Sequence, residues 1–184
     1  MQARRLQAQS MLAGLARNNA WANFRLLKAC AGLPPEELTA ERSGFFPSIL
    51  ETLAHILMVD RYYLAMLERR TAFSRDQAAL VAEGFAAIKA GQEESDRRLI
   101  GFCDALGADG AEGEVVLIRD QGVRYRETVR AVLLHLFQHD IHHRGQVHAM
   151  LSSTGVAPPQ LDEFFLEQDA DIRRTDLAAM GLKP

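Results

Sequence analysis

Residues 128–153, TVRAVLLHLFQHDIHHRGQVHAMLSS, decide the fold of this chain. Apolar side chains recur in this stretch at the three- and four-residue intervals of an amphipathic α-helix. These apolar residues are Val132, Leu133, Leu134, Leu136, Phe137, Ile141, Val147, Met150 and Leu151. Gly155, Pro158 and Pro159 then end the pattern, as glycine and proline do just past a helix. The stretch therefore predicts a long helix.

Three further amphipathic stretches precede this helix. Ser48 and Glu51, like Ser74 and Gln77, have the capping-box spacing that starts helices, and they mark the beginnings of the second and third stretches. Four long amphipathic helices with mostly short connections predict an all-α protein, an antiparallel four-helix bundle. The three stretches span about residues 3–30, 47–69 and 74–106.

Two smaller features accompany these helices. Residues 114–126 contain two short β-type runs on either side of Asp120 to Gly122, which predicts a small hairpin before the fourth helix. The tail, residues 161–184, is expected to hold one or two short helical turns. With 184 residues, 48% of them hydrophobic, the chain suits a single domain over residues 1–184.

The composition excludes several classes of partner. The 21 basic and 24 acidic residues give a net charge of −3, which favours neither nucleic acid nor an anionic membrane surface. No stretch approaches the roughly 20 apolar residues of a membrane-spanning helix. Cys30 and Cys103 stand alone, with no disulfide framework, and the N-terminus lacks a signal-peptide pattern. A cytoplasmic protein is expected.

Histidines cluster in the fourth predicted helix. His139 and His143 are one helical turn apart on one stripe, so their imidazoles can converge on one cation. His148 falls on the opposite side of the helix, and His142 at the edge of the stripe. Of the six histidines, five lie within 14 residues: His135, His139, His142, His143 and His148.

The sixth histidine, His55, lies in the middle of the second predicted helix. Two ligands alone rarely hold a metal, and a bundle brings such mid-helix positions together across its core. We therefore predict a metal site made of His55, His139 and His143. Three imidazoles leave the cation at least one open position, at which a bound water or thiol is acidified and becomes a nucleophile. Imidazole donors suit several metals, so the ligand set does not identify the ion.

Four neighbouring residues are candidates for the pocket or for contacts to the ligands. His135 is one turn before His139 on the same stripe and is expected to pack or to line the pocket. Gln146 faces the same way and is a candidate to form a hydrogen bond with one of the metal-binding histidines. Glu51, four residues before His55, is read either as a partner of a ligand or as a solvated charge at a helix start. Tyr62 is read as pocket wall or core.

Two other metal motifs fit the sequence less well. His139, Asp140 and His143 have the outline of the zinc-protease helix motif H-E-x-x-H, with Glu163 downstream as a third ligand. However, Asp140 is one methylene shorter than the Glu of that motif and falls off the histidine stripe. A di-iron carboxylate bundle needs paired Glu-x-x-His motifs, and the chain has none. Arg144 also points away from the stripe and is read as structural.

The stretch from Leu134 to His148 resembles the signature helix of the DinB-like (damage-inducible) family of bundle proteins. That signature places two ligand histidines four residues apart, with Arg-Gly-Gln after the second, as at His139 and His143 here. Residues 17–23, 34–38 and 48–55 also match in type and order, so the resemblance covers most of the chain. One departure is Gln138, where the family commonly has Asn, and it puts a contact to a ligand in doubt.

The resemblance implies a four-helix bundle that holds a divalent metal on three histidines, with nickel or zinc ahead of manganese or iron, and that forms a homodimer. Some members are transferases or isomerases that use low-molecular-weight thiols, and many have no known activity. Two functions stay open. The first is a metal-dependent transferase or hydrolase-like enzyme that activates a thiol or water toward a small-molecule substrate. The second is a non-catalytic stress-response protein with a structural or sensory metal, for which His135 or Glu51 would close the site.

Overall fold

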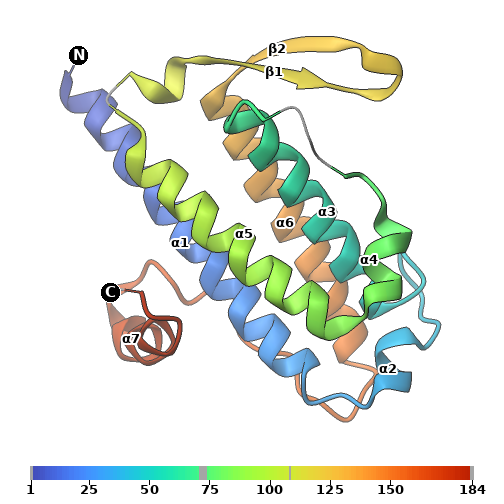
Figure 1. The fold of residues 1–184 in the computed structure, drawn as a ribbon. Helices are drawn as coiled ribbons and strands as arrows, with labels where there is room; N and C mark the ends of the chain where they lie inside the picture. Colours follow the sequence, from blue (N-terminus) through green and yellow to red (C-terminus); the bar gives the residue numbers. More distant parts are fainter. Residues whose placement is uncertain (1, 71–73, 108, 183–184) are drawn as a thin grey trace.

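The computed structural model describes residues 2–70, 74–107 and 109–182, which are mostly helical and include one two-stranded sheet. Four long helices lie side by side and make up most of the molecule (Figure 1). The all-α class predicted from the sequence is confirmed at this level. The long helices are α1 (Gln2–Cys30), α3 (Ile49–Leu67), α5 (Phe85–Ala105) and α6 (Val129–Leu151).

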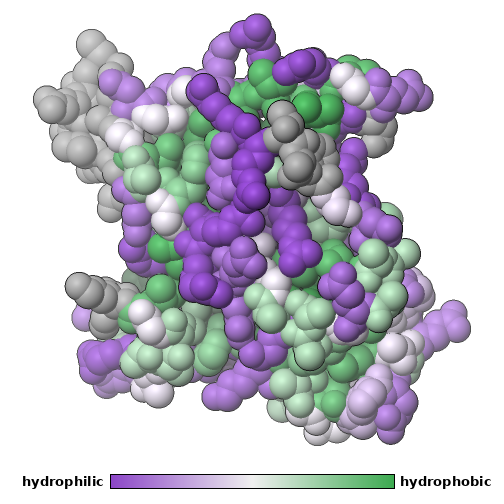
Figure 2. All heavy atoms as spheres, viewed as in Figure 1, coloured by the Kyte–Doolittle hydropathy of each residue, from purple (hydrophilic) through white to green (hydrophobic). Residues whose placement is uncertain are grey.

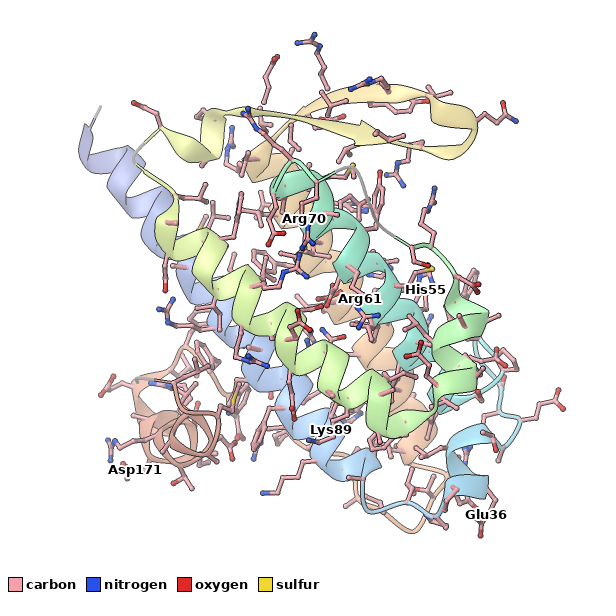
Figure 3. All side chains as sticks on the ribbon, in the orientation of Figure 1. Glu36, His55, Arg61, Arg70, Lys89 and Asp171 are labelled. Carbon is pink, nitrogen blue, oxygen red and sulfur yellow. The ribbon has the colours of Figure 1, made fainter. Side chains whose placement is uncertain are left out.

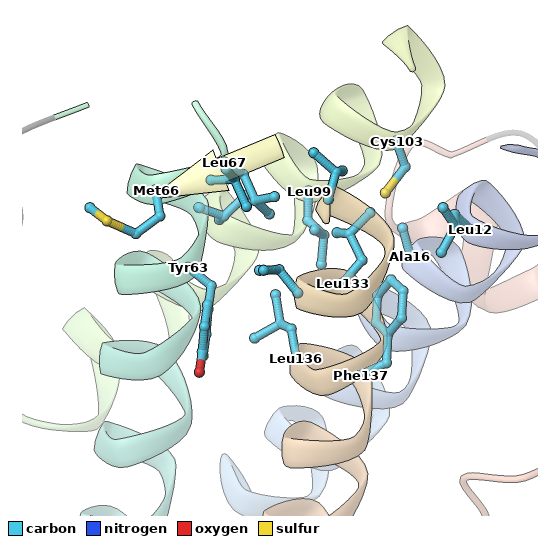
Figure 4. Close-up of a cluster of buried hydrophobic side chains, with 14 of the residues drawn as sticks. Leu12, Ala16, Tyr63, Met66, Leu67, Leu99, Cys103, Leu133, Leu136 and Phe137 are labelled. Carbon is cyan, nitrogen blue, oxygen red and sulfur yellow. The ribbon is translucent and has the colours of Figure 1, made fainter. Parts of the chain in front are cut away.

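The long helices enclose an apolar core. Helix α1 packs on α5 and α6, and α3 packs on the same two helices. Figure 4 shows one cluster in which side chains from all four helices meet. Burial of each such leucine stabilises the folded state by about 1.5–3 kcal/mol relative to leaving it exposed. The packing of these side chains therefore holds α3 and α6 against each other. Labelled members of the cluster are Leu12, Ala16, Tyr63, Met66, Leu67, Leu99, Cys103, Leu133, Leu136 and Phe137.

The helix starts follow capping chemistry, with one correction. Ser48 caps α3 as predicted, and its hydroxyl accepts a hydrogen bond from the Glu51 backbone N–H at 3.2 Å. The single third helix predicted from Ser74 is wrong. The chain forms α4 (Gln77–Glu83), capped by Asp76, and then turns at Gly84 before α5. Gly84 has φ of +84°, a conformation that favours glycine, and it ends α4.

The predicted hairpin is confirmed. Strands β1 (Glu114–Ile118) and β2 (Arg124–Thr128) pair antiparallel, with Ile118 opposite Arg124. Positive φ at Gln121 and Gly122 makes the reversal. The Tyr62 hydroxyl of α3 donates to the Ile118 carbonyl at 3.0 Å, which ties the tip of β1 to the helices.

Shorter elements complete the fold. Helix α2 (Pro35–Thr39) follows α1, and 3₁₀ turns span Gly110–Glu112, Asp120–Gly122 and Glu167–Asp169. The tail forms α7 (Ala170–Ala179), as expected for a short helical segment. The Trp21 indole N–H donates to Asp176 at 3.0 Å and so holds α7 against α1.

Polar and charged side chains run along the middle of the face that carries α5 (Figure 2). In the parts of the chain that the structure describes, none of the helices has both the length and the apolar character needed to span a bilayer.

Candidate metal centre

Three histidines from two helices meet at one point. His55 comes from the middle of α3 (Figure 3), and His139 and His143 come from successive turns of α6. Their ligand-capable nitrogens all lie within 4.8 Å of one another, and the Nε2 atoms of His55 and His139 are 3.1 Å apart. We call these residues the three-histidine cluster. Its members are the three residues singled out from the sequence.

An oxygen atom holds the outer nitrogen of each ring. Gln77, the first residue of α4, donates its amide N–H to the Glu51 backbone carbonyl at 3.1 Å, and this turns its amide oxygen toward His55. Each Nδ1 therefore carries a proton, which it donates outward, and each Nε2 presents a lone pair to the cluster. The Nδ1 distances are 3.2 Å from His55 to Gln77 Oε1, 3.3 Å from His139 to Asp140 Oδ1, and 2.8 Å from His143 to Gln146 Oε1.

The electrostatics of the cluster suit a cation. Burial lowers the pKa of His143 to about 4 and also lowers the pKa of His55, so both rings are neutral near pH 7. The Nε2 atoms of His55 and His139 face each other across a gap of 3.1 Å, and both are turned inward by the oxygen atoms that hold their Nδ1 atoms. A cation that binds both nitrogens would satisfy them together. Three imidazoles that converge in this way are a donor set that fits a divalent transition-metal ion.

A cavity of about 240 Å³ opens beside the cluster, and His55 and His139 form part of its wall. Tyr62 and His135, both candidates from the sequence, also line this cavity. Glu51 contributes its backbone carbonyl, which accepts the hydrogen bond from Gln77. Among the described residues, neither His135 nor the Glu51 carboxylate joins the group of potential ligands.

A comparison with known proteins identifies the family of this chain. The model of the DinB family matches residues 7–175. The chain belongs to the DinB family. A similar curated protein is Protein DinB of Bacillus subtilis (strain 168), which is 23% identical over 158 residues, covering 78% of this chain and 86% of that protein.

This member of the DinB family also contains a buried polar network that the sequence analysis missed. Asp140 and Arg144 lie off the histidine stripe, as expected, but they are buried in the interior between the helices, where they are 0% and 4% exposed. The Arg144 guanidinium donates to Asn19 and, at 3.0 Å, to Asn23, and it lies 3.8 Å from Asp140. A helical projection of α6 that shows one buried stripe does not show that the helix is also buried on a second side. The polar residues Asn19 and Asn23 in the predicted first helix were the sequence feature that could have indicated this network.

Two more carboxylates share this interior. Burial, with the neighbouring charges of Asp140 and Asp96, raises the pKa of Asp60 well above its usual range. Burial likewise raises the pKa of Asp96 to about 7. The network thus surrounds Asp140, whose carboxylate holds the Nδ1 of His139. A buried framework on the DinB helices therefore orients one ring of the cluster.

Proposed function

We propose that the three-histidine cluster holds one divalent ion, with nickel or zinc ahead of manganese or iron, and that the protein is a transferase or hydrolase-like enzyme. The observation that carries the proposal is the convergence of three Nε2 lone pairs whose rings are fixed by outward hydrogen bonds. When bound, such a cation acidifies a water or thiol at its open position.

An enzyme is favoured over a structural or sensory site for two reasons. First, among the described residues the potential ligand group contains three histidines and no fourth His, Cys, Asp or Glu, which favours an open coordination position. Second, the cavity beside the cluster leaves room for a small-molecule substrate, with or without a low-molecular-weight thiol. The Phe46 ring, 4.5 Å from the His55 ring, shields one side of the cluster from water.

The helix arrangement supports a finer scaffold proposal. The mutual packing of α1, α3, α5 and α6 supports an antiparallel four-helix bundle that forms one domain. The family resemblance supports a homodimer, and the two free cysteines, Cys30 and Cys103, support a location in the cytoplasm. These points stay predictions.

Elemental analysis tests the metal site. Protein purified without a nickel column should contain close to one divalent ion per chain, and His139→Ala should abolish this content because the site loses a ligand. The matched control is His148→Ala, since His148 lies on the same helix and bonds to the Pro159 carbonyl instead. Full metal occupancy in the His139→Ala protein would refute the assignment.

A turnover assay separates the two functions. The metal-loaded protein is mixed with a panel of electrophiles and with glutathione-type, mycothiol-type or bacillithiol-type thiols. Loss of free thiol that depends on both metal and protein supports the enzyme. A fully loaded protein that consumes no thiol and hydrolyses none of the panel supports the non-catalytic function.

A further inference from the structure

Two arginines form one wall of the cavity beside the three-histidine cluster. Arg75 precedes α4, and Arg119 directly follows β1 in the hairpin. The Arg75 guanidinium lies 5.2 Å from the centre of the Tyr62 ring, and that of Arg119 lies 5.8 Å from the same ring. Both distances are those of cation–π contacts. We call Arg75 and Arg119 the arginine wall.

The hairpin holds Arg119 in place. Its backbone N–H donates to the Val123 carbonyl at 2.8 Å, which closes the turn. Its Nη2 donates to the Tyr63 hydroxyl at 3.0 Å, while the guanidinium lies 5.8 Å from the centre of the Tyr63 ring. A planar guanidinium fixed in this way keeps further N–H donors available, and binding a ligand costs less rotamer entropy.

Arg119 brings a positive charge to the cavity, where its guanidinium donates a hydrogen bond to a neutral hydroxyl, that of Tyr63. Among the described residues, no ion pair engages Arg119. Glu127 borders the neighbouring cavity, which Arg119 also lines. A concave, positively charged wall next to a cation site attracts an anion.

We propose that the arginine wall binds the anionic group, a carboxylate or phosphate, of a small substrate or co-substrate whose other end reaches the three-histidine cluster. This inference rests on the function proposed above. Arginine forks match both anions through paired N–H donors. The cavity of about 240 Å³ lies below the roughly 300–1,000 Å³ typical of drug-sized ligands, so the ligand is small.

Two probes of nearly equal size test the inference in the cobalt(II)-loaded protein. 3-Mercaptopropionate carries a carboxylate, and 3-mercaptopropionamide carries a neutral amide in its place. Binding of either sulfur to cobalt is followed by the absorption band it produces. We expect the wild type to bind the carboxylate probe at least about tenfold more tightly, the size of one charge-assisted hydrogen bond.

Substitution of Arg119 should remove this preference. Arg119→Gln should weaken the carboxylate probe at least about tenfold and leave the amide probe unchanged. Arg119→Lys should retain part of the preference, because it keeps the charge but loses the fork. Arg124→Gln is the matched control, since Arg124 is an exposed arginine of the same hairpin that lines a different cavity. Competition by inorganic phosphate and by acetate shows which oxyanion the wall prefers.

The possible failures can be told apart. Equal binding of both probes by the wild type would overturn the inference and leave the metal site standing. An Arg119→Gln protein that weakens both probes alike, or neither, would do the same, because its effect would then be structural or absent. Failure of the wild type to take up cobalt would refute the three-histidine site itself, and this inference with it.

Discussion

Asp96→Asn should stabilise the protein near pH 8 and leave its stability almost unchanged near pH 4. Asp96 lies on α5, is 6% exposed, and accepts a hydrogen bond from the Asn23 side chain at 2.9 Å. An asparagine oxygen can accept the same bond, so the substitution removes a buried ionisable group and little else.

The pKa of Asp96 sets the size of the effect. Burial first, and then the charge of Asp140, raises this pKa to about 7 from an ordinary value of 3.8. Between these values the folded state keeps a proton that the unfolded state releases, so the wild type loses stability as pH rises. A difference of about three pKa units corresponds to roughly 4 kcal/mol. The asparagine variant has no such group and lacks this loss.

Urea unfolding followed by circular dichroism, from about pH 4 to about pH 8, measures the effect. The difference between variant and wild type should grow with pH and level off above about pH 7. Glu94→Gln is the control, because it makes the same acid-to-amide change at an exposed site of α5 and should shift stability by less than about 0.5 kcal/mol. Parallel pH curves for the Asp96 variant and the wild type would refute the reasoning.

Three further outcomes are expected. Removal of the metal by a chelator should lower the melting temperature measured by calorimetry. The free energy of unfolding should fall by about 4 kcal/mol if the ion was present at about a thousand times its dissociation constant. An unchanged melting temperature after confirmed metal removal would contradict coupling between metal binding and folding. Gln77→Leu should weaken metal binding about 10–100-fold in competition with a chromophoric chelator, because the His55 ring loses its partner; unaltered affinity would argue against that role. Gly91→Ala should cost about 1–3 kcal/mol in urea unfolding, since its Cβ would lie 2.9 Å from Leu57, whereas Gly101→Ala, with open space, should stabilise by up to about 1 kcal/mol; equal effects would contradict the packing.

The sequence predicted those parts of the site that depend on one helix. The four-residue spacing of His139 and His143 makes their rings converge once α6 is helical. The approach of His55 follows only from the general rule that facing helices of a bundle bring mid-helix residues together. Gln77 could not be predicted in this role. Its contact with His55 depends on how α4 docks on α3, and the sequence analysis joined α4 to the helix that follows Gly84.

The buried network shows a second limit. Helical periodicity locates a face by its apolar residues, so Asp140 and Arg144 were assigned outward from the histidine stripe. Their burial depends on partners from other helices, such as Asn19 and Asn23 of α1, and these tertiary pairings leave no periodic trace. A polar side of a helix can therefore be buried when residues of other helices bind its charged groups.

The hairpin and the helices supply different parts of the site. The three histidines belong to α3 and α6, whereas Arg119 belongs to the loop that closes β1 and β2. Exchange of this loop, as a short cassette, would change which molecules are admitted without altering the rings that hold the ion. Ligand selectivity and metal binding would thus reside in separate segments of the chain, and each could be engineered without disturbing the other.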